Sequence, residues 1–463
     1  GGSAGSGNPV PVLASKGGIV VRAFRPETGD DEGSKALEAK ASQHSHNWFL
    51  TTFVKVHVRH LSAFDAKARK FDDSVVLVAV DREASQSGPD AEGDSIVGQA
   101  VGDGFICGCI CMGIKEAWLH GERRRVGYLF DLRVHEDYQR RGVGSLLNRT
   151  VESEARRKGA SAIYLTVNSS NQKAREFYDK HGYGLASERA LLFKPLILAS
   201  SVQGGDDFSS VCSRVPGMRM RRASVEELAS VVDEALSLSE EKADERVGED
   251  LALVGGFKAL CSACPGKLLD AWIAEVDGSS AALALWDGDG TSTIQVERLL
   301  LTLAAWRHPL TPVLPLALSC VGISMWAQAV LSSAPSALSV LSGLALLGVI
   351  GLGLAFAVIL RFVLTRERER ARLIAPVALG PRGMELLSAL VKHGEATAKQ
   401  LGFAVSIVNL DLDDPKVSAW QSGRPPARTR FLLKALDEPS PKAGEAHPRR
   451  FSPLSFFDPR DMS

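Results

Sequence analysis

The residues best placed to do chemistry form a short glycine-containing loop, Gln139 to Gly144. The apolar residues before it alternate, which predicts a half-buried strand, and those after it recur at helical spacing. These residues are Phe130, Leu132 and Val134, then Val143, Leu146, Leu147, Val151 and Ala155. Glycines at such a turn let a ligand approach the backbone, and the first N–H groups of a helix attract phosphate. We therefore predict an anion site suited to a pyrophosphate.

Two common phosphate motifs do not fit this loop. No Gly-Lys-Ser/Thr follows it, and the Gly-x-Gly-x-x-Gly spacing of dinucleotide-binding proteins is missing. An ordinary α/β crossover with a glycine-rich turn is the alternative interpretation of the loop taken by itself.

A second segment follows in order. Ser161 to Val167 predicts a strand, and Asn171 to Tyr183 reads Asn-x-x-Ala-x-x-Phe-Tyr-x-Lys-x-Gly-Tyr. Together with Gln139-x-x-Gly-x-Gly, this segment resembles the acyl-coenzyme-A loop and the next helix of the GNAT superfamily of N-acetyltransferases. The resemblance implies an α/β (α+β) fold with a GNAT-like mixed sheet flanked by helices, and acetyl-CoA as co-substrate.

The resemblance also implies a mechanism and a set of cofactor contacts. A substrate amine would attack acetyl-CoA directly, while the pantetheine arm pairs with the strand near Leu132 as an added strand does. The loop backbone would hold the pyrophosphate, and Arg140 or Arg141 could meet the outer phosphates. The implied cofactor-binding residues are Leu132, Arg133, Val134, Gln139, Arg140, Arg141, Gly142, Val143, Gly144 and Asn171.

Two residues are candidates for proton transfer. Tyr178 matches the tyrosine that many GNAT enzymes use as general acid, and a phenol of pKa about 10 can protonate a thiolate when it is well placed. The alternative is a half-buried aromatic residue of the helix. Asp131 is the first candidate for the base, with Glu116 and His135 behind it. Arg133 on the same face could instead make Asp131 a structural ion pair.

Composition narrows the partners. The 54 basic and 54 acidic residues balance, so no nucleic-acid partner is expected. The seven cysteines show no disulfide spacing, which favours a reducing compartment. Cys107, Cys109 and Cys111 alternate and should share one face, and one flat strand cannot wrap a tetrahedral ion. We expect no metal site, and nothing indicates the oligomeric state.

The 463 residues suffice for several domains. We expect a GNAT N-acetyltransferase domain whose final part, residues 127–195, runs strand, helix, strand, helix, strand, strand. A second, degenerate GNAT-like half should bind no cofactor, because Gly380-Pro-Arg-Gly383 lacks the loop spacing. The predicted parts are a disordered lead-in (1–16), the first domain (17–198), a linker (199–215), the second half in two pieces (216–304 and 366–437), an apolar hairpin (309–364) and a disordered tail (438–463).

Residues 309–360 contain no Asp, Glu, Lys or Arg, a length that allows two membrane spans of about 20 residues each. Val313 to Val330 and Ala337 to Leu360 would form a helical hairpin, and a buried pair of core helices is the alternative. Arginines flank the stretch on both sides, so the positive-inside rule predicts a two-span membrane protein with both soluble parts on the cytoplasmic or equivalent side.

A closer resemblance comes from four stretches. Phe105 to Cys111, Gly127 to Val134, Tyr138 to Gly144 and Asn171 to Tyr183 resemble plant Hookless-type N-acetyltransferases. A second, divergent half that ends near Trp420 also resembles that family, whereas the hairpin departs from it. The expected function is acetyl transfer to a primary amine of a protein or small molecule. The alternative is a non-catalytic, membrane-tethered acetyl-CoA sensor or scaffold.

Overall fold

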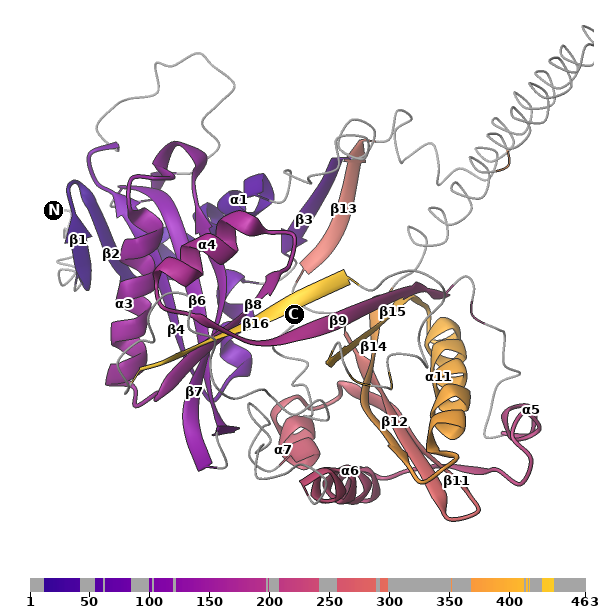
Figure 1. The fold of residues 1–463 in the computed structure, drawn as a ribbon. Coiled ribbons are helices and arrows are strands. Elements are labelled where there is room, and N and C mark those ends of the chain that lie inside the picture. Colours follow the sequence, from indigo (N-terminus) through magenta and orange to yellow (C-terminus); the bar gives the residue numbers. More distant parts are fainter. Residues whose placement is uncertain are drawn as a thin grey trace, which may run out of the picture.

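The computed structural model describes residues 12–41, 55–60, 63–84, 100–101, 104–119, 122–196, 199, 208–240, 256–288, 292–298, 351, 368–411, 414, 416 and 427–436. Most of the strands join one 14-stranded mixed sheet, and helices cover both of its faces (Figure 1). A separate two-stranded ribbon pairs β3 (Lys55–His60) with β13 (Ser292–Arg298). The mixed α/β architecture agrees with the predicted GNAT-like fold class.

The N-terminal half is built on an antiparallel series that ends in one parallel pair. The series is β1 (Ala14–Lys16), β2 (Ile19–Ala23), β4 (Asp73–Asp81), β6 (Gly104–Leu119) and β7 (Glu122–Val134). β7 then pairs in parallel with β8 (Ala162–Asn168), and the short β5 (Ala100–Val101) pairs with β6. The strand predicted before the glycine loop and the strand predicted from residue 161 are therefore confirmed.

Helices cover each face of this half. The predicted amphipathic helix is α3 (Val143–Arg157), whose apolar stripe packs in one core cluster with Tyr178 from α4 (Gln172–Lys180). On the other face, three short 3₁₀ turns accompany α1 (Asp30–Ala41), and α1 and the last two of these turns contribute Leu37, Phe64 and Ala68 to a second cluster. These turns are η1 (Pro26–Thr28), η2 (Phe64–Ala66) and η3 (Ala68–Lys70). The two faces of β7 thus meet different helices.

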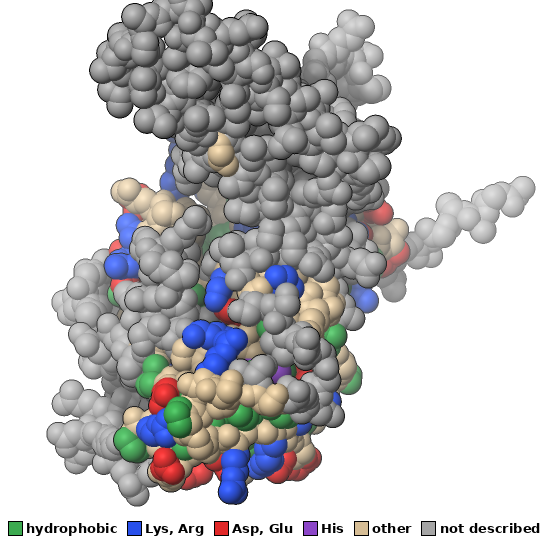
Figure 2. Space-filling model, turned by 90° about the vertical axis from the view of Figure 1, so that its right-hand side faces the viewer, with side chains coloured by type: hydrophobic (Ala, Val, Ile, Leu, Met, Phe, Trp, Pro, Cys, Tyr) green, Lys and Arg blue, Asp and Glu red, His purple; other side chains and the backbone are tan. Residues whose placement is uncertain are grey.

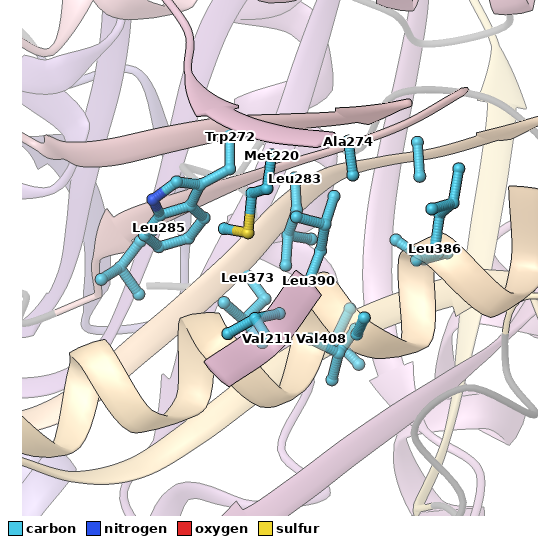
Figure 3. Packing of buried hydrophobic residues seen from close by; sticks show 14 of the residues in the cluster. Val211, Met220, Trp272, Ala274, Leu283, Leu285, Leu373, Leu386, Leu390 and Val408 are labelled. Atoms are coloured by element: carbon cyan, nitrogen blue, oxygen red, sulfur yellow. The ribbon is translucent and has the colours of Figure 1, made fainter. Parts of the chain in front are cut away.

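The C-terminal half repeats this arrangement. Its strands are β10 (Arg219–Arg222), β11 (Leu268–Val276), β12 (Ser279–Asp287), β14 (Arg368–Leu379) and β15 (Phe403–Asp411), of which the last two are parallel. One face packs on α11 (Gly383–Gln400) and α5 (Ser209–Cys212), where Trp272 and Leu390 share a dense apolar cluster (Figure 3). The other face packs on α6 (Val225–Glu240) and α7 (Gly256–Ala263).

The two halves exchange strands at the centre of the sheet. β16 (Ala427–Ala435) lies antiparallel between β8 and β9 (Gly184–Pro195), and β9 also pairs with β15. The prediction of two strands at the end of residues 127–195 is wrong, because one long strand forms there and its neighbour comes from the far end of the chain. The boundary at residue 198 therefore does not separate two independent sheets.

Two smaller predictions are also corrected. The lead-in assigned to residues 1–16 ends earlier, since Ala14–Lys16 pair with β2. Cys107 does not share a face with Cys109 and Cys111, because the pairing of β4 with β6 shifts register at Cys107 and sends it into the α3 cluster. All three cysteines are buried, as small apolar residues would be.

The hairpin predicted for residues 309–364 lies outside the described residues, apart from Gly351. Most of the predicted lead-in, all of the predicted tail and parts of the linker lie outside them as well. Of the helices that the structure does describe, none has both the length and the apolar composition required to span a membrane.

Candidate active site

The site begins where β7 leaves its parallel neighbour. β7 pairs with β8 from Val126 to Leu129. Beyond that point Asp131 has a positive φ of 52°, and the register with β6 slips so that Ile110 faces two residues of β7. Such a bulge bends the strand and re-aims its side chains. The backbone around Leu132 to Val134, which we predicted to pair with pantetheine, thus follows the bulge and lies past the end of the β7–β8 ladder.

The glycine loop follows directly. After the 3₁₀ turn η5 (Glu136–Tyr138), Arg140 and Gly142 adopt left-handed φ values of 61° and 90°, and α3 begins at Val143. The first turn of α3 carries no acidic side chain and Gly142 offers no side-chain cap. Its amide donors and the helix dipole therefore favour an anion at this point.

A cation from another strand lies against this loop. A Cβ built on Gly142 would lie 2.7 Å from the ammonium nitrogen of Lys16 at the end of β1. Arg141 lies over the Tyr138 ring, 5.1 Å from the centroid. Lys16 was missed from the sequence because it fell in the predicted disordered lead-in. Together with Arg140, these cations add positive charge around the start of α3.

Polar contacts with β4 and β7 hold the loop in place. The Tyr138 hydroxyl donates to the Asp81 carboxylate at 2.8 Å, and its ring stacks on Phe105 with centroids 5.8 Å apart. Burial and the bond to Asp81 raise the pKa of Tyr138. The Gln139 amide donates to the Val134 carbonyl at 3.3 Å. Gln139 therefore ties the loop to the end of β7.

Asn171 and Tyr178 lie at the start and near the end of α4. The Asn171 side chain caps α4 by accepting from the Ala174 N–H at 3.1 Å, so its amide oxygen has a structural role. Tyr178 is buried and packs edge-on against Phe177 and Tyr183. Burial raises the pKa of Tyr178, which keeps its proton in place at neutral pH. The cofactor contact of Asn171 and the acid role of Tyr178 stay predictions.

The charged residues at the bulge act on Tyr178. Arg133 lowers the pKa of Tyr178 and Asp131 raises it, so both lie within electrostatic reach of the phenol. Asp131 and Arg133 also form an ion pair with 3.6 Å between Oδ1 and Nη2. The structural alternative for Asp131 is thus present in the molecule, next to the predicted acid.

The two reserve candidates for the base lie elsewhere. The Glu116 carboxylate accepts from the Arg123 guanidinium at 2.7 Å, and Glu116 lies opposite Arg125 of β7. Arg125 is six residues before Asp131, a separation of about 20 Å along the strand. His135 is buried against Phe105, and its Nδ1 accepts from the Asp137 N–H at 3.4 Å. Neither side chain belongs to the group of charges at the bulge. No cluster of His, Cys, Asp and Glu suited to a metal ion occurs within the described ranges.

A charged residue that the sequence gave no reason to select lies at the bulge. Glu38 of α1 is 7% exposed and interacts electrostatically with Asp131, Arg133 and Lys67. Only the packing of α1 onto β7 brings it there, and no motif surrounds it in the sequence.

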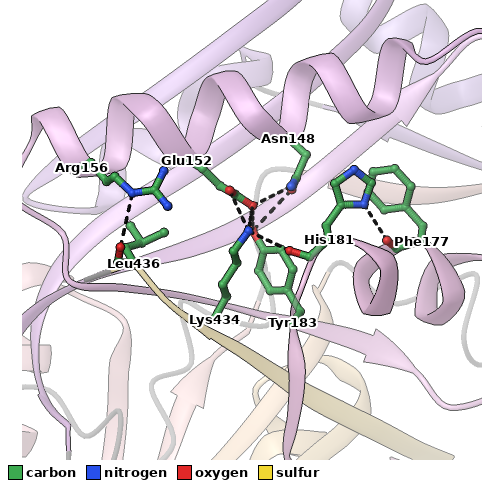
Figure 4. A network of polar contacts seen from close by, with 8 residues as sticks. All are labelled: Asn148, Glu152, Arg156, Phe177, His181, Tyr183, Lys434 and Leu436. Atoms are coloured by element: carbon green, nitrogen blue, oxygen red, sulfur yellow. Dashed lines mark hydrogen bonds and ion pairs between the residues drawn. The ribbon is translucent and has the colours of Figure 1, made fainter. Parts of the chain in front are cut away.

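A buried network joins the site to the exchanged strand (Figure 4). The Lys434 ammonium on β16 donates to both carboxylate oxygens of Glu152 at 2.9 and 2.8 Å and to the His181 carbonyl at 2.7 Å. Glu152 also accepts from Asn148 and from the Tyr183 hydroxyl. These bonds hold α3, which begins at the end of the glycine loop, against a strand from the end of the chain.

The corresponding loop of the C-terminal half is built differently. β14 has its own bulge at Ala375, with φ of 51°, but Arg382 occupies the start of α11. Its guanidinium contacts Asp277 at 3.3 Å and Glu385 at 2.9 Å. A Cβ on Gly380 would lie 2.8 Å from the Ser279 hydroxyl. Figure 2 views the molecule from the right-hand side of Figure 1, and both Lys or Arg and Asp or Glu side chains lie on the described part of that face. That this half binds no cofactor stays a prediction.

Comparison with known proteins identifies the N-terminal segment. Residues 66–183 match the profile described as the acetyltransferase (GNAT) family. None of the curated proteins matches the chain. The matched segment includes the bulge, the glycine loop, α3 and α4.

Several solved structures match the chain at low identity. A GCN5-related glucosamine N-acetyltransferase region of a fungal GH3 β-N-acetylglucosaminidase is 14% identical, with a TM-score of 0.48, over 92% of this chain and 38% of that one. A GCN5-related N-acetyltransferase from Kribbella flavida is 14% identical, with a TM-score of 0.38, over 90% and 72%. Saccharomyces cerevisiae N-myristoyltransferase with myristoyl-CoA is 8% identical, with a TM-score of 0.47, over 91% and 84%.

The family match covers the segment that holds both sequence motifs. It supports the predicted acetyl-CoA co-substrate and the predicted enzyme class. Residues 66–183 therefore have the fold of the GNAT acetyltransferases.

Proposed function

We propose that this chain is an N-acetyltransferase that transfers the acetyl group of acetyl-CoA to a primary amine of a protein or small molecule by direct attack in a ternary complex. One observation carries the proposal: the bulged strand β7 runs straight into a left-handed loop at Gly142 and the first turn of α3. The edge of the strand suits the extended pantetheine arm of CoA, and the anion site that follows it suits the diphosphate of CoA.

The charges around the loop support the same ligand. Lys16 and Arg141 lie beside the first turn of α3, whose dipole already favours negative charge. We assign the pyrophosphate to the backbone of residues 139–144 and the pantetheine arm to the backbone of Leu132 to Val134. This arrangement would bring the thioester to the bulge, beside Asp131.

Tyr178 supplies the proton for the departing thiolate in this proposal. Its phenol is buried, remains protonated at neutral pH and lies within electrostatic reach of Arg133 and Asp131. A positioned proton donor contributes about 10²–10⁴-fold to such a step. Asp131 keeps Arg133 in place through their ion pair and remains a candidate for contact with the amine.

The test is release of free thiol from acetyl-CoA by the full-length chain with a panel of amines and lysine peptides. The full chain is required because β16 completes the sheet between β8 and β9. We expect thiol release that depends on at least one amine and is accompanied by its acetylation. Tight binding of CoA without release by any acceptor would overturn catalysis and favour the sensor or scaffold.

We further propose that residues 309–360 anchor the chain in a membrane as two spans. The absence of charged residues and the flanking arginines support this anchor. The closer relation to Hookless-type N-acetyltransferases rests on the same stretches of sequence as before and stays part of the proposal. Alkaline carbonate washing of membranes that contain the tagged chain tests the anchor: the chain should stay in the pellet, and its release would contradict two spans.

A further inference from the structure

Glu38 and Tyr178 approach the same pair of charges from different helices. Asp131 and Arg133, at the bulge of β7, act electrostatically on Tyr178 of α4 and on Glu38 of α1. The α1 helix packs against β6 and β7, whereas Tyr178 belongs to the core cluster of α3. A buried carboxyl and a buried phenol thus lie within electrostatic reach of the same two charged residues.

The surroundings of Glu38 make it a far stronger base than a carboxylate in water. The charged and titratable groups that face it are Asp131 and Arg133 of β7, Lys67 beside η3, and the Cys109 and Cys111 thiols of β6. Burial, followed by the charge of Asp131, raises the pKa of Glu38 to about 7, while Arg133 and Lys67 oppose the shift. A base works best when its pKa is near the working pH.

A buried lysine is one of the groups that act on Glu38. The Lys67 side chain is buried, and its ammonium lies 4.3 Å from the centre of the Phe130 ring. Burial lowers the pKa of Lys67, and Asp131 raises it. A buried carboxyl whose pKa is shifted by burial and by specific charged neighbours is a candidate for proton transfer.

We propose that Glu38 is the base that takes the proton from the incoming ammonium group of the acceptor. This inference rests on the proposed function. The Glu38 carboxylate accepts one proton from R–NH₃⁺, directly or through one water, and the free amine then attacks the acetyl carbon. The C–N bond forms, the C–S bond breaks, and the sulfur takes a proton from Tyr178. The second proton leaves the nitrogen for the Tyr178 phenolate, and Glu38 releases its own proton to solvent.

Asp131 is less suited to this role. Its carboxylate is paired with Arg133 at 3.6 Å on the strand that would hold the carrier. Asp131 and Arg133 therefore act as positioning residues between the base and the acid.

The test compares nucleophiles that need a base with one that does not. The full-length chain receives acetyl-CoA with propylamine, which is almost fully protonated at neutral pH, or with hydroxylamine, which is largely unprotonated. We expect Glu38→Gln to lower kcat/KM for propylamine by about 10²–10⁴-fold and to remove the acid limb near pH 7. The hydroxylamine reaction should fall by less than about tenfold, and the Kd for CoA should not change.

A matched variant controls for loss of a buried charge. Glu395 of α11 is also buried and pairs with Lys194 of β9, and it lies far from the loop in sequence. Glu395→Gln should leave the pH profile as in the wild type, and Glu38→Asp should restore part of the propylamine rate.

The outcomes separate this inference from the proposed function. A wild-type rate and acid limb in Glu38→Gln, or equal losses with both nucleophiles, would overturn the assignment of Glu38 alone. A wild-type chain that releases no thiol with either nucleophile would overturn the proposed function and this inference with it.

Discussion

Besides its pairing with β8, one buried ion pair connects the exchanged strand β16 to the active-site half. The side chains of Lys434 and Glu152 are 11% and 6% exposed, and their contacts are 2.8 and 2.9 Å long. Replacing Lys434 with Met leaves the Glu152 carboxylate buried among Asn148 and Tyr183 without its cation. Removing one partner of a buried pair costs about 3–5 kcal/mol.

A double-mutant cycle isolates this cost. Glu152→Gln removes the buried charge that Lys434→Met leaves without a partner, so the double variant should recover much of the lost stability. The assay is urea unfolding of the full-length chain, followed by the fluorescence of its tryptophans and by circular dichroism. We expect Lys434→Met to lower the free energy of unfolding by about 3 kcal/mol or more, and we expect the double variant to lie closer to the wild type.

The network also predicts a functional effect. The pair fixes α3, so Lys434→Met should weaken CoA binding although Lys434 lies on β16 rather than in the loop. A loss of stability under about 1 kcal/mol, or losses that simply add in the double variant, would refute the claim that this contact holds the exchanged strand in place.

Three further predictions concern the site itself. Tyr178→Phe should lower kcat by about 10²–10³-fold and leave the Kd for CoA unchanged, and unaltered turnover with any accepted amine would exclude the acid role. Lys16→Ala should weaken CoA binding about threefold at low salt and less at high salt, which titrations at two ionic strengths would measure. The folded chain holds the Glu38 proton up to about pH 7, whereas the unfolded chain releases it near pH 4.5. The stability of the wild type therefore falls as the pH rises from about 4.5 to about 7. Glu38→Gln cannot titrate, so its stability relative to the wild type should rise by about 3 kcal/mol from pH 4 to pH 8, and parallel stability curves would contradict the shift.

The local elements were predictable from periodicity and turn residues. Alternation at Phe130 to Val134 and helical spacing from Val143 indicate β7 and α3, because these signals depend on near neighbours in the sequence. The bulge at Asp131 was not predictable in this way, and it places Phe130 in one core cluster and Leu132 and Val134 against the other. The order of the two motifs is sufficient to indicate the GNAT fold of residues 66–183.

The features that were missed depend on contacts distant in sequence. β16 enters the sheet between β8 and β9 through pairing such as Leu432 with Leu165, which no local pattern encodes. The register shift at Cys107 turns its side chain to the opposite face of β6 from Cys109, because one extra residue breaks the alternation of side chains along the strand. Glu38 and Lys16 reach the site only through the packing of α1 and the pairing of β1 with β2.

The central claim is that the loop at the start of α3 grips the diphosphate of CoA, and calorimetric titration of the full-length chain with CoA tests it most directly. Gly142→Ala and Gly159→Ala impose a similar left-handed strain of about 1–2 kcal/mol, since the two glycines have φ of 90° and 78°. Only Gly142 lies in the loop, where the added Cβ would also displace Lys16, whereas Gly159 has open space around it. We predict saturable binding that weakens at least about tenfold in Gly142→Ala and stays unchanged in Gly159→Ala. No heat with the wild type, or equal affinities for the two variants, would contradict the account.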